Sequence, residues 1–130
     1  ISFNLVSKMN KINKFYKKSK KPSNFFELYT KYLFKILNEV DKNSIDQLFK
    51  EFVDARNNGA TIFVAGNGGS AATATTMSND IGFDIIKKTN TNKPFKVVSL
   101  TDNSSVISAI ANDIGYENLF VSQLKIHYKK

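Results

Sequence analysis

The chain has 130 residues, of which 42% are hydrophobic and 12% aromatic, so it can build the core of one ordinary domain. No apolar run approaches the roughly 20 residues that span a bilayer, and no long apolar stretch follows the lysine-rich start as it would in a signal peptide. The sequence has no cysteine, which excludes disulfides and thiolate metal sites. We therefore expect a cytoplasmic protein.

Basic residues are concentrated at the start of the chain. Residues 1–22 hold seven lysines and no acidic residue, whereas the rest of the chain holds twelve basic and eleven acidic residues. Such a segment can bind nucleic acid or an anionic membrane, or it can be a solvated, flexible leader. The absence of arginine and the scarcity of interleaved aromatic residues favour the leader. We therefore expect no membrane and no nucleic-acid partner.

Residues 23–58 are expected to form two amphipathic helices. Pro22-Ser23-Asn24 is a helix-start signal, and apolar residues follow it at three- and four-residue spacing as far as Val40. Ser44 is expected to cap a second helix, which stops at Asn57-Asn58-Gly59. The two helices predict a helical hairpin. Its aromatic stripe is more typical of a core or a subunit interface than of a ligand-binding surface.

Residues 59–130 alternate between strand and helix patterns. The expected elements, in chain order, are a strand at Thr61–Ala65, a helix at about 71–81, a strand at Phe95–Leu100, and helices at 101–110 and 116–127. A loop at 90–94 and a turn at 112–115 separate them. This alternation predicts an α/β fold with parallel strands.

A glycine-rich turn, Gly66-Asn67-Gly68-Gly69-Ser70, follows the first strand. We interpret it as a tight turn into a helix, with Ser70 as the N-cap. Such a turn directs backbone N–H groups and the positive end of a helix at one point, which suits a phosphate. Cβ atoms at the glycines would block the turn and the approach of a ligand. The alternative is a turn and cap with a structural role only.

The strand Ile62-Phe63-Val64 is apolar on both faces, which is typical of the middle of a parallel sheet. Two strands cannot cover it. The sequence begins at Ile1 rather than Met and stops after two strands, at Lys130. We therefore expect either a portion of a longer protein or partner chains that supply the missing cover.

Three ordered blocks resemble the phosphoheptose isomerase group of sugar isomerase (SIS) domains. They are Gly66–Ala72 followed by Asn79-Asp80, then Ser99–Asn103, then Ala111–Glu117. The resemblance runs from about residue 25 to the end of the chain. It implies a flavodoxin-like parallel sheet of SIS type preceded by the helical hairpin, with the C-terminal half of the domain missing. It also implies a homo-oligomer, a tetramer packed through the N-terminal helices.

The resemblance implies a phosphosugar ligand and the aldose–ketose isomerisation of sedoheptulose 7-phosphate to an aldoheptose 7-phosphate. Such a reaction moves a proton between adjacent carbons through an enediol and needs a general base and a general acid. Many members of the group also use a metal ion to polarise the sugar oxygen. Zinc is therefore a candidate cofactor of the intact protein, whereas we expect none in this chain alone.

The resemblance also assigns site residues. Asn67, Gly68, Gly69 and Ser70 match the substrate-binding turn, Asn112 and Asp113 match a substrate-contacting pair, and Asp80 matches the catalytic and metal-binding carboxylate. The structural alternatives are a helix-end turn for Asn112 and Asp113 and a solvated helix residue for Asp80.

One departure from the family pattern concerns the metal. Thr76 stands where the group usually has a metal-ligand histidine, four residues before Asp80, and threonine is a poor zinc ligand. The single histidine, His127, is expected at the surface. The chain therefore carries part of a phosphosugar site without a complete catalytic set. The alternative function is a non-catalytic SIS module that binds a phosphosugar or a protein partner, and a nucleic-acid-binding role for the lysine leader is a third possibility.

Overall fold

The computed structural model of the protein describes residues 10–128. Contacts divide the chain into two compact units, Ile1–Ile45 and Asp46–Lys130. Residues 1–9 of the expected leader lie outside the described residues. In the part that is described, no helix is long and apolar enough to cross a membrane. The division at residues 22 and 58 that the sequence suggests stays a prediction.

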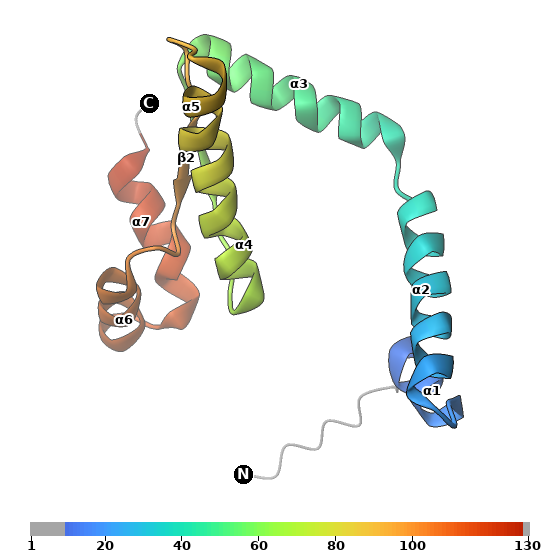
Figure 1. Ribbon diagram of the computed structural model, residues 1–130. Helices are drawn as coiled ribbons and strands as arrows, with labels where there is room; N and C mark the ends of the chain where they lie inside the picture. The colour runs from blue at the N-terminus through green and yellow to red at the C-terminus, as the bar shows by residue number, and fades with distance from the viewer. Residues whose placement is uncertain (1–9, 129–130) are drawn as a thin grey trace. The chain divides into compact units, whose positions relative to one another are not determined.

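The first unit contains α1 (Lys11–Lys18) and α2 (Pro22–Asn38). The sequence pattern of residues 11–18, which is dominated by lysines, did not predict α1. The side chain of Asn10 caps α1 by accepting a 2.8 Å hydrogen bond from the backbone N–H of Asn13. The ring of Phe15 packs edge-on against Tyr32 of α2, with 5.6 Å between ring centroids. Part of the leader that was expected to be flexible is therefore a helix packed on α2 (Figure 1).

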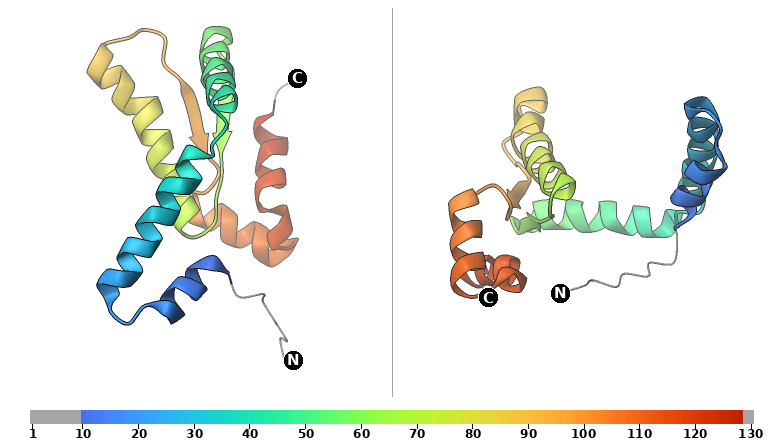
Figure 2. Two further views of the ribbon diagram at one scale, coloured as in Figure 1. Left: turned by 90° about the vertical axis from the view of Figure 1, so that its right-hand side faces the viewer. Right: turned by 90° about the horizontal axis from the view of Figure 1, so that it is seen from below.

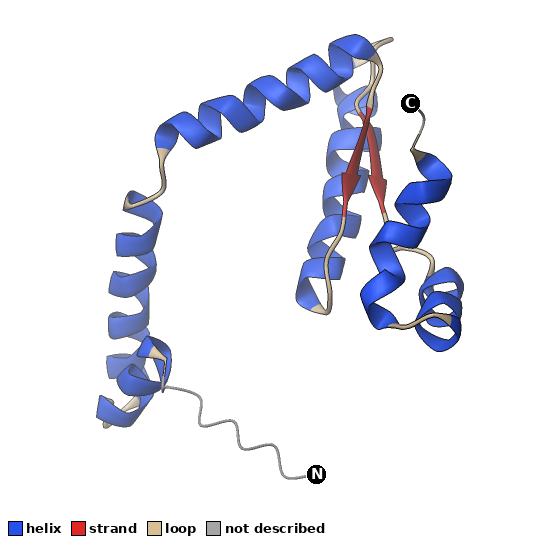
Figure 3. Cartoon of the chain, turned by 180° about the vertical axis from the view of Figure 1, so that it is seen from behind, coloured by secondary structure: helices blue, strands red, loops and turns tan. Residues whose placement is uncertain are grey.

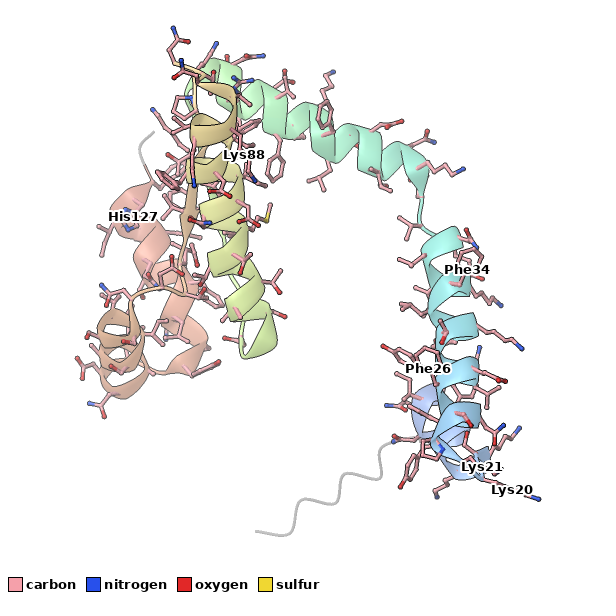
Figure 4. All side chains as sticks on the ribbon, viewed as in Figure 1. Lys20, Lys21, Phe26, Phe34, Lys88 and His127 are labelled. Carbon is pink, nitrogen blue, oxygen red and sulfur yellow. The ribbon has the colours of Figure 1, made fainter. Side chains whose placement is uncertain are left out.

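The expected helices over residues 23–58 are confirmed as α2 and α3 (Lys42–Asn58). Both carry large apolar side chains that the described residues leave exposed. Phe26 and Phe34 of α2, labelled in Figure 4, are each 67% exposed. Phe49 of α3 is 71% exposed. The packing of α2 and α3 as a hairpin stays a prediction.

The cap of α3 differs from the expectation, since Asp41 and not Ser44 caps this helix. The Asp41 carboxylate accepts hydrogen bonds from the backbone N–H groups of Asn43 and Ser44, both at 3.1 Å. The Ser44 hydroxyl donates to the same carboxylate at 2.7 Å. The hydroxyl of Ser44 and the backbone N–H of Asn43 hold the pKa of Asp41 below its usual range. A carboxylate one residue before the helix suits the exposed N–H groups of its first turn.

The second unit contains a parallel pair of strands, β1 (Thr61–Val64) and β2 (Lys96–Ser99), as the alternating pattern predicted. Their register pairs Thr61 with Lys96 and Val64 with Ser99. The apolar residues of β1 are only half-buried among the described residues. The parallel fold is therefore confirmed for the two strands that this part of the chain contributes.

A single helical rod connects the strands. It consists of α4 (Gly69–Met77), the π-helical segment η1 (Ser78–Asp84) and α5 (Ile85–Thr89), so it is longer than the expected helix at 71–81. The hydroxyl of Ser78 donates to the backbone oxygen of Val97 at 2.9 Å, which ties the rod to β2. A Cβ on Gly82 would lie 4.0 Å from the backbone oxygens of Phe95 and Val97, which is ordinary van der Waals contact. Figure 2 shows the rod beside the strands in two further views.

The remaining elements are α6 (Ser104–Asp113), the 3-10 turn η2 (Tyr116–Asn118) and α7 (Leu119–His127). Asn103 caps α6 by accepting from the N–H of Val106 at 3.1 Å, so this helix starts later than the expected residue 101. Figure 3 shows the α4–α5 rod and α7 on opposite sides of the strands. Leu100 and Leu119, only 3% and 2% exposed, lie in the core.

Two side chains of α7 face the strands and the loop that follows β2. Gln123 is buried, and its Nε2 donates to the backbone oxygens of Leu100 and Leu119, both at 2.9 Å. His127 is exposed, as expected, and its ring lies 5.9 Å from the ring of Phe63 (Figure 4). The Gln123 bond to Leu100 holds the loop after β2, which borders the predicted site.

Candidate functional site

The glycine turn between β1 and α4 is tight, as predicted. A Cβ on Gly66 would lie 2.4 Å from the backbone carbon and oxygen of Ser70, so the turn closes only with glycine there. Gly68 has a φ of +56°, which L side chains rarely adopt. A Cβ on Gly69 would meet no atom within 4 Å. The expectation that the turn itself excludes a Cβ therefore holds for Gly66 and Gly68 and is wrong for Gly69.

The prediction that Ser70 is the N-cap of α4 is also wrong. The helix begins at Gly69, and Gly68 occupies the cap position without a side-chain cap. Ser70 lies in the first turn, where its backbone N–H donates to the oxygen of Asn67 at 3.0 Å. Over residues 10–128, the N–H groups of Gly68 and Gly69 donate no hydrogen bond to protein atoms. These two donors lie at the positive end of α4, where an anion is stabilised.

Asn67 lies beside Tyr116, which the sequence analysis placed in a resemblance block without a role. The Tyr116 hydroxyl donates to Oδ1 of Asn67 at 2.7 Å, across 49 residues of sequence. Asn67, Gly68 and Tyr116 line a cavity of about 180 Å³ whose apolar side is formed by Ile107, Leu119 and Phe120. The signal that could have identified Tyr116 is its place in the third block, three residues after Asp113.

Ser70 lines a different hollow from Asn67. This hollow, of about 420 Å³, is lined by Val64, Ala65, Ser70, Thr73, Ala74 and Met77. Thr76 and Asp80 line a third hollow of about 500 Å³, to which Thr73 and Met77 also belong. The expectation that Thr76 and Asp80 share a helix face agrees with this arrangement. The hollow of Ser70 on α4 therefore adjoins the hollow of Asp80 on η1.

Asn112 and Asp113 lie at the end of α6 and line none of these three hollows. Both are exposed, and Nδ2 of Asn112 donates to the carboxylate of Asp113 at 3.0 Å. Gly115, with a φ of +99°, then turns the chain toward Tyr116. Within the described residues, the third block therefore meets the glycine turn through Tyr116 rather than through the predicted pair.

The second block, which follows β2, also contacts α4. The hydroxyl of Thr101 donates to the backbone oxygen of Ala71 at 3.4 Å. The hydroxyl of Thr75 donates to the carboxylate of Asp102 at 2.5 Å. These bonds hold the first two turns of α4 against the loop after β2. No role was expected for Thr75 or Asp102, because a hydrogen bond between two elements has no local sequence signal.

The donor set near Asp80 does not fit a zinc ion by itself. Thr76 supplies a hydroxyl and Asp80 a carboxylate, whereas protein zinc sites use three or four imidazole, thiolate or carboxylate ligands. Among residues 10–128 no three histidine, aspartate or glutamate side chains come together as a possible metal site. The side chain of Asp80 instead accepts a 3.2 Å hydrogen bond from Nδ2 of Asn79.

Comparison with curated proteins shows that the chain is similar to phosphoheptose isomerases. It is 32% identical over 95 residues to a probable phosphoheptose isomerase of Thermoplasma volcanium, covering 73% of this chain and 47% of that protein. It is 37% identical over 82 residues to a phosphoheptose isomerase of Aneurinibacillus thermoaerophilus, covering 62% and 39%. It is 38% identical over 76 residues to phosphoheptose isomerase 2 of Campylobacter jejuni, covering 58% and 36%. The chain spans less than half the length of these relatives.

A solved structure gives the same relation at the level of the fold. The phosphoheptose isomerase GmhA from Neisseria gonorrhoeae superposes with a TM-score of 0.51 and 24% identity, covering 78% of this chain and 54% of that one. No family model matches the chain. The α/β fold that the resemblance implied is confirmed, with a parallel strand pair of this type.

Proposed function

Because the chain is a relative of the phosphoheptose isomerases, we propose that the whole protein binds a heptose phosphate and interconverts sedoheptulose 7-phosphate and an aldoheptose 7-phosphate. The observation that carries the proposal is the glycine turn at the start of α4. There the N–H groups of Gly68 and Gly69 stay available at the positive end of a helix. The dianionic phosphate of a sugar phosphate suits this arrangement.

The volumes of the hollows support a site in which different parts of the ligand occupy different hollows. Pockets that hold a whole small molecule measure about 300–1,000 Å³, and the cavity lined by Asn67 measures about 180 Å³. That cavity therefore suits one end of a sugar phosphate. The hollow of Ser70 shares Thr73 and Met77 with the hollow of Asp80, so one extended ligand can reach both side chains.

In this proposal, the chemistry assigned to Asp80 is acid–base catalysis. An aldose–ketose isomerisation removes a proton from the carbon beside the carbonyl and returns it to the former carbonyl carbon through an enediol. The Asp80 carboxylate is exposed to the hollow and can accept such a proton. Asn112 and Asp113 are proposed to contact the sugar hydroxyls, since both side chains are exposed and polar.

A second candidate function is binding without catalysis. Thr76, in place of the histidine usual in the group, leaves a hydroxyl and a single carboxylate in the hollow of Asp80. A protein with this donor set can bind a phosphosugar, or a protein partner, without isomerising a sugar. Zinc in the intact protein stays a proposal that needs ligands from outside residues 10–128.

The test is turnover and binding by the complete protein. We expect sedoheptulose 7-phosphate to bind and an aldoheptose 7-phosphate to appear, as measured by calorimetry and by chromatography of the products. Asp80→Asn keeps the size of the side chain and should abolish turnover while leaving binding in place. Binding without turnover by the unmodified protein would favour the non-catalytic module. Neither binding nor turnover would refute both the isomerase and the phosphosugar-binding module.

The exposed apolar residues of α2 and α3 support a proposed homo-oligomer, with a tetramer as the state that the family resemblance implies. Phe26, Phe34 and Phe49 give these helices exposed apolar surface that contact with other chains can bury. Light scattering of the complete protein at micromolar concentration should give a mass of four chains, and a monomer would refute the proposal. We also propose a cytoplasmic location.

A further inference from the structure

We propose that Tyr116 is a positioning residue for the phosphosugar: its hydroxyl orients the Asn67 carboxamide so that the amide N–H groups face the ligand. The inference rests on the proposed function, since it concerns the ligand of the same glycine turn. It assigns a role to a residue outside the turn itself. The inference is based on the 2.7 Å hydrogen bond from the Tyr116 hydroxyl to Oδ1 of Asn67.

The direction of this bond decides what Asn67 can offer. A carboxamide has an acceptor oxygen and a donor NH₂ group, and a half-turn about its last bond exchanges them. A phosphate oxygen needs a donor and is repelled by the oxygen. Because Tyr116 donates to Oδ1, the Nδ2 group keeps two N–H donors, and neither is used by another protein atom in the described chain. Nδ2 can then join the N–H groups of Gly68 and Gly69 around one anion.

The backbone around Tyr116 is held in place. Gly115 has a φ of +99°, and the N–H of Asn118 donates to its oxygen at 3.1 Å. The side chain of Asn118 donates to the oxygen of Ile114 at 2.6 Å. Leu119, directly after this turn, is buried in the core. The hydroxyl of Tyr116 is therefore presented to Asn67 from a fixed point.

The exposure of Tyr116 argues against a mainly structural role. Its side chain is 58% exposed, so its ring contributes little burial to the core. Asn67 is exposed as well, so the bond is not part of the buried core. What the bond does is select one orientation of the carboxamide beside the cavity that both residues line.

The test compares Tyr116→Phe with the unmodified complete protein. This change removes the hydroxyl and keeps the ring. Because the variant loses the net contribution of one hydrogen bond, it should bind sedoheptulose 7-phosphate about two- to tenfold more weakly in calorimetry. KM should rise by the same factor while kcat stays constant, because the bond acts on binding before and during the reaction. Tyr128→Phe, at an exposed tyrosine of the same unit, is the matched control and should change neither value.

A double-mutant cycle separates positioning from packing. If Tyr116 acts through Asn67, then Tyr116→Phe in an Asn67→Ala background should weaken binding no further. Equal losses in both backgrounds, or a Tyr116→Phe variant that binds like the unmodified protein, would overturn the positioning role. A lower urea midpoint for Tyr116→Phe alone would assign the bond to stability instead. No binding by the unmodified protein would overturn the proposed function and the positioning role together, so the two failures are distinguishable.

Discussion

Gln123 offers a sharp test of how the loop after β2 is held. Its Nε2 donates to the backbone oxygen of Leu100, and Leu100 is itself bonded to β1 through its N–H and the oxygen of Val64, at 2.9 Å. The second acceptor, the oxygen of Leu119, belongs to the same helix as Gln123. The Leu100 oxygen is therefore the group that depends most on this side chain. We consider two substitutions, Gln123→Leu and Gln123→Glu.

Gln123→Leu leaves the buried Leu100 oxygen without its donor and should destabilise the fold by about 1–3 kcal/mol. Gln123→Glu should cost about 3–5 kcal/mol at pH 7, because it places a buried negative charge against two carbonyl oxygens. Burial and those oxygens raise the pKa of the introduced carboxyl in the folded state. Its penalty is therefore full above that raised pKa and fades as pH falls toward the unfolded value of about 4.3.

The assay is urea unfolding of the complete protein at pH 7 and at about pH 4.5, with the midpoint and the slope compared between variants. The difference between Gln123→Glu and Gln123→Leu should shrink markedly at the lower pH, where a protonated carboxyl can donate to Leu100. Gln123→Glu that is as stable as the unmodified protein at pH 7 would refute the reasoning. A pH-independent difference between the two variants would also refute it.

Three further predictions concern the turn, a helix cap and the metal. Ser70→Ala in the complete protein should weaken phosphosugar binding by about 1.5–3 kcal/mol. Gly68→Val should abolish binding, because the φ of +56° at this position strains any side chain. Unchanged affinity of both variants in calorimetry would remove the turn from the site. Asp41→Ala should lower the urea midpoint at neutral pH. Because the cap bonds lower the pKa of Asp41, the difference in midpoint between the variant and the unmodified protein should vanish as pH falls through that lowered pKa. A midpoint difference that persists in acid would contradict this. Thr76→His should raise zinc content by elemental analysis, since it adds an imidazole to the hollow of Asp80; equal zinc in both proteins would exclude this position as a ligand.

The strands, the glycine turn and most helices could be predicted because their signals are local. Thr61–Val64 and Lys96–Ser99 each contain a short run of β-branched or aromatic residues, with glycine or proline within two residues of at least one end, and each lies where the pattern placed it. The long helical rod was underestimated, because Gly82 weakens a helix pattern. The hydrogen bond from Ser78 to Val97 that ties this rod to β2 is visible only in the fold.

Helix caps illustrate a second limit of local patterns. Ser44 and Ser70 are good capping residues, yet Asp41 and Gly68 occupy the cap positions of α3 and α4. At Asp41, a carboxylate accepts from two N–H groups and the serine becomes one of its donors. At Gly68, the positive φ brings the chain into the helix before Ser70 is reached. A cap depends on the backbone angles as much as on the side chain, and several residues in a row can satisfy the pattern.

The candidate site shows why residue types alone do not define a site. Asn67 and Ser70 are three residues apart, yet they line different hollows because α4 begins between them and turns the serine toward Thr73 and Met77. Tyr116 reaches Asn67 from 49 residues away, and only the fold brings the two together. The start of α4 thus separates Asn67 from Ser70 within the glycine turn, and the fold places Tyr116 of the third block beside Asn67. In the proposed phosphosugar site, the turn would therefore offer donors on two sides of α4, and we propose that Tyr116 sets the orientation of Asn67.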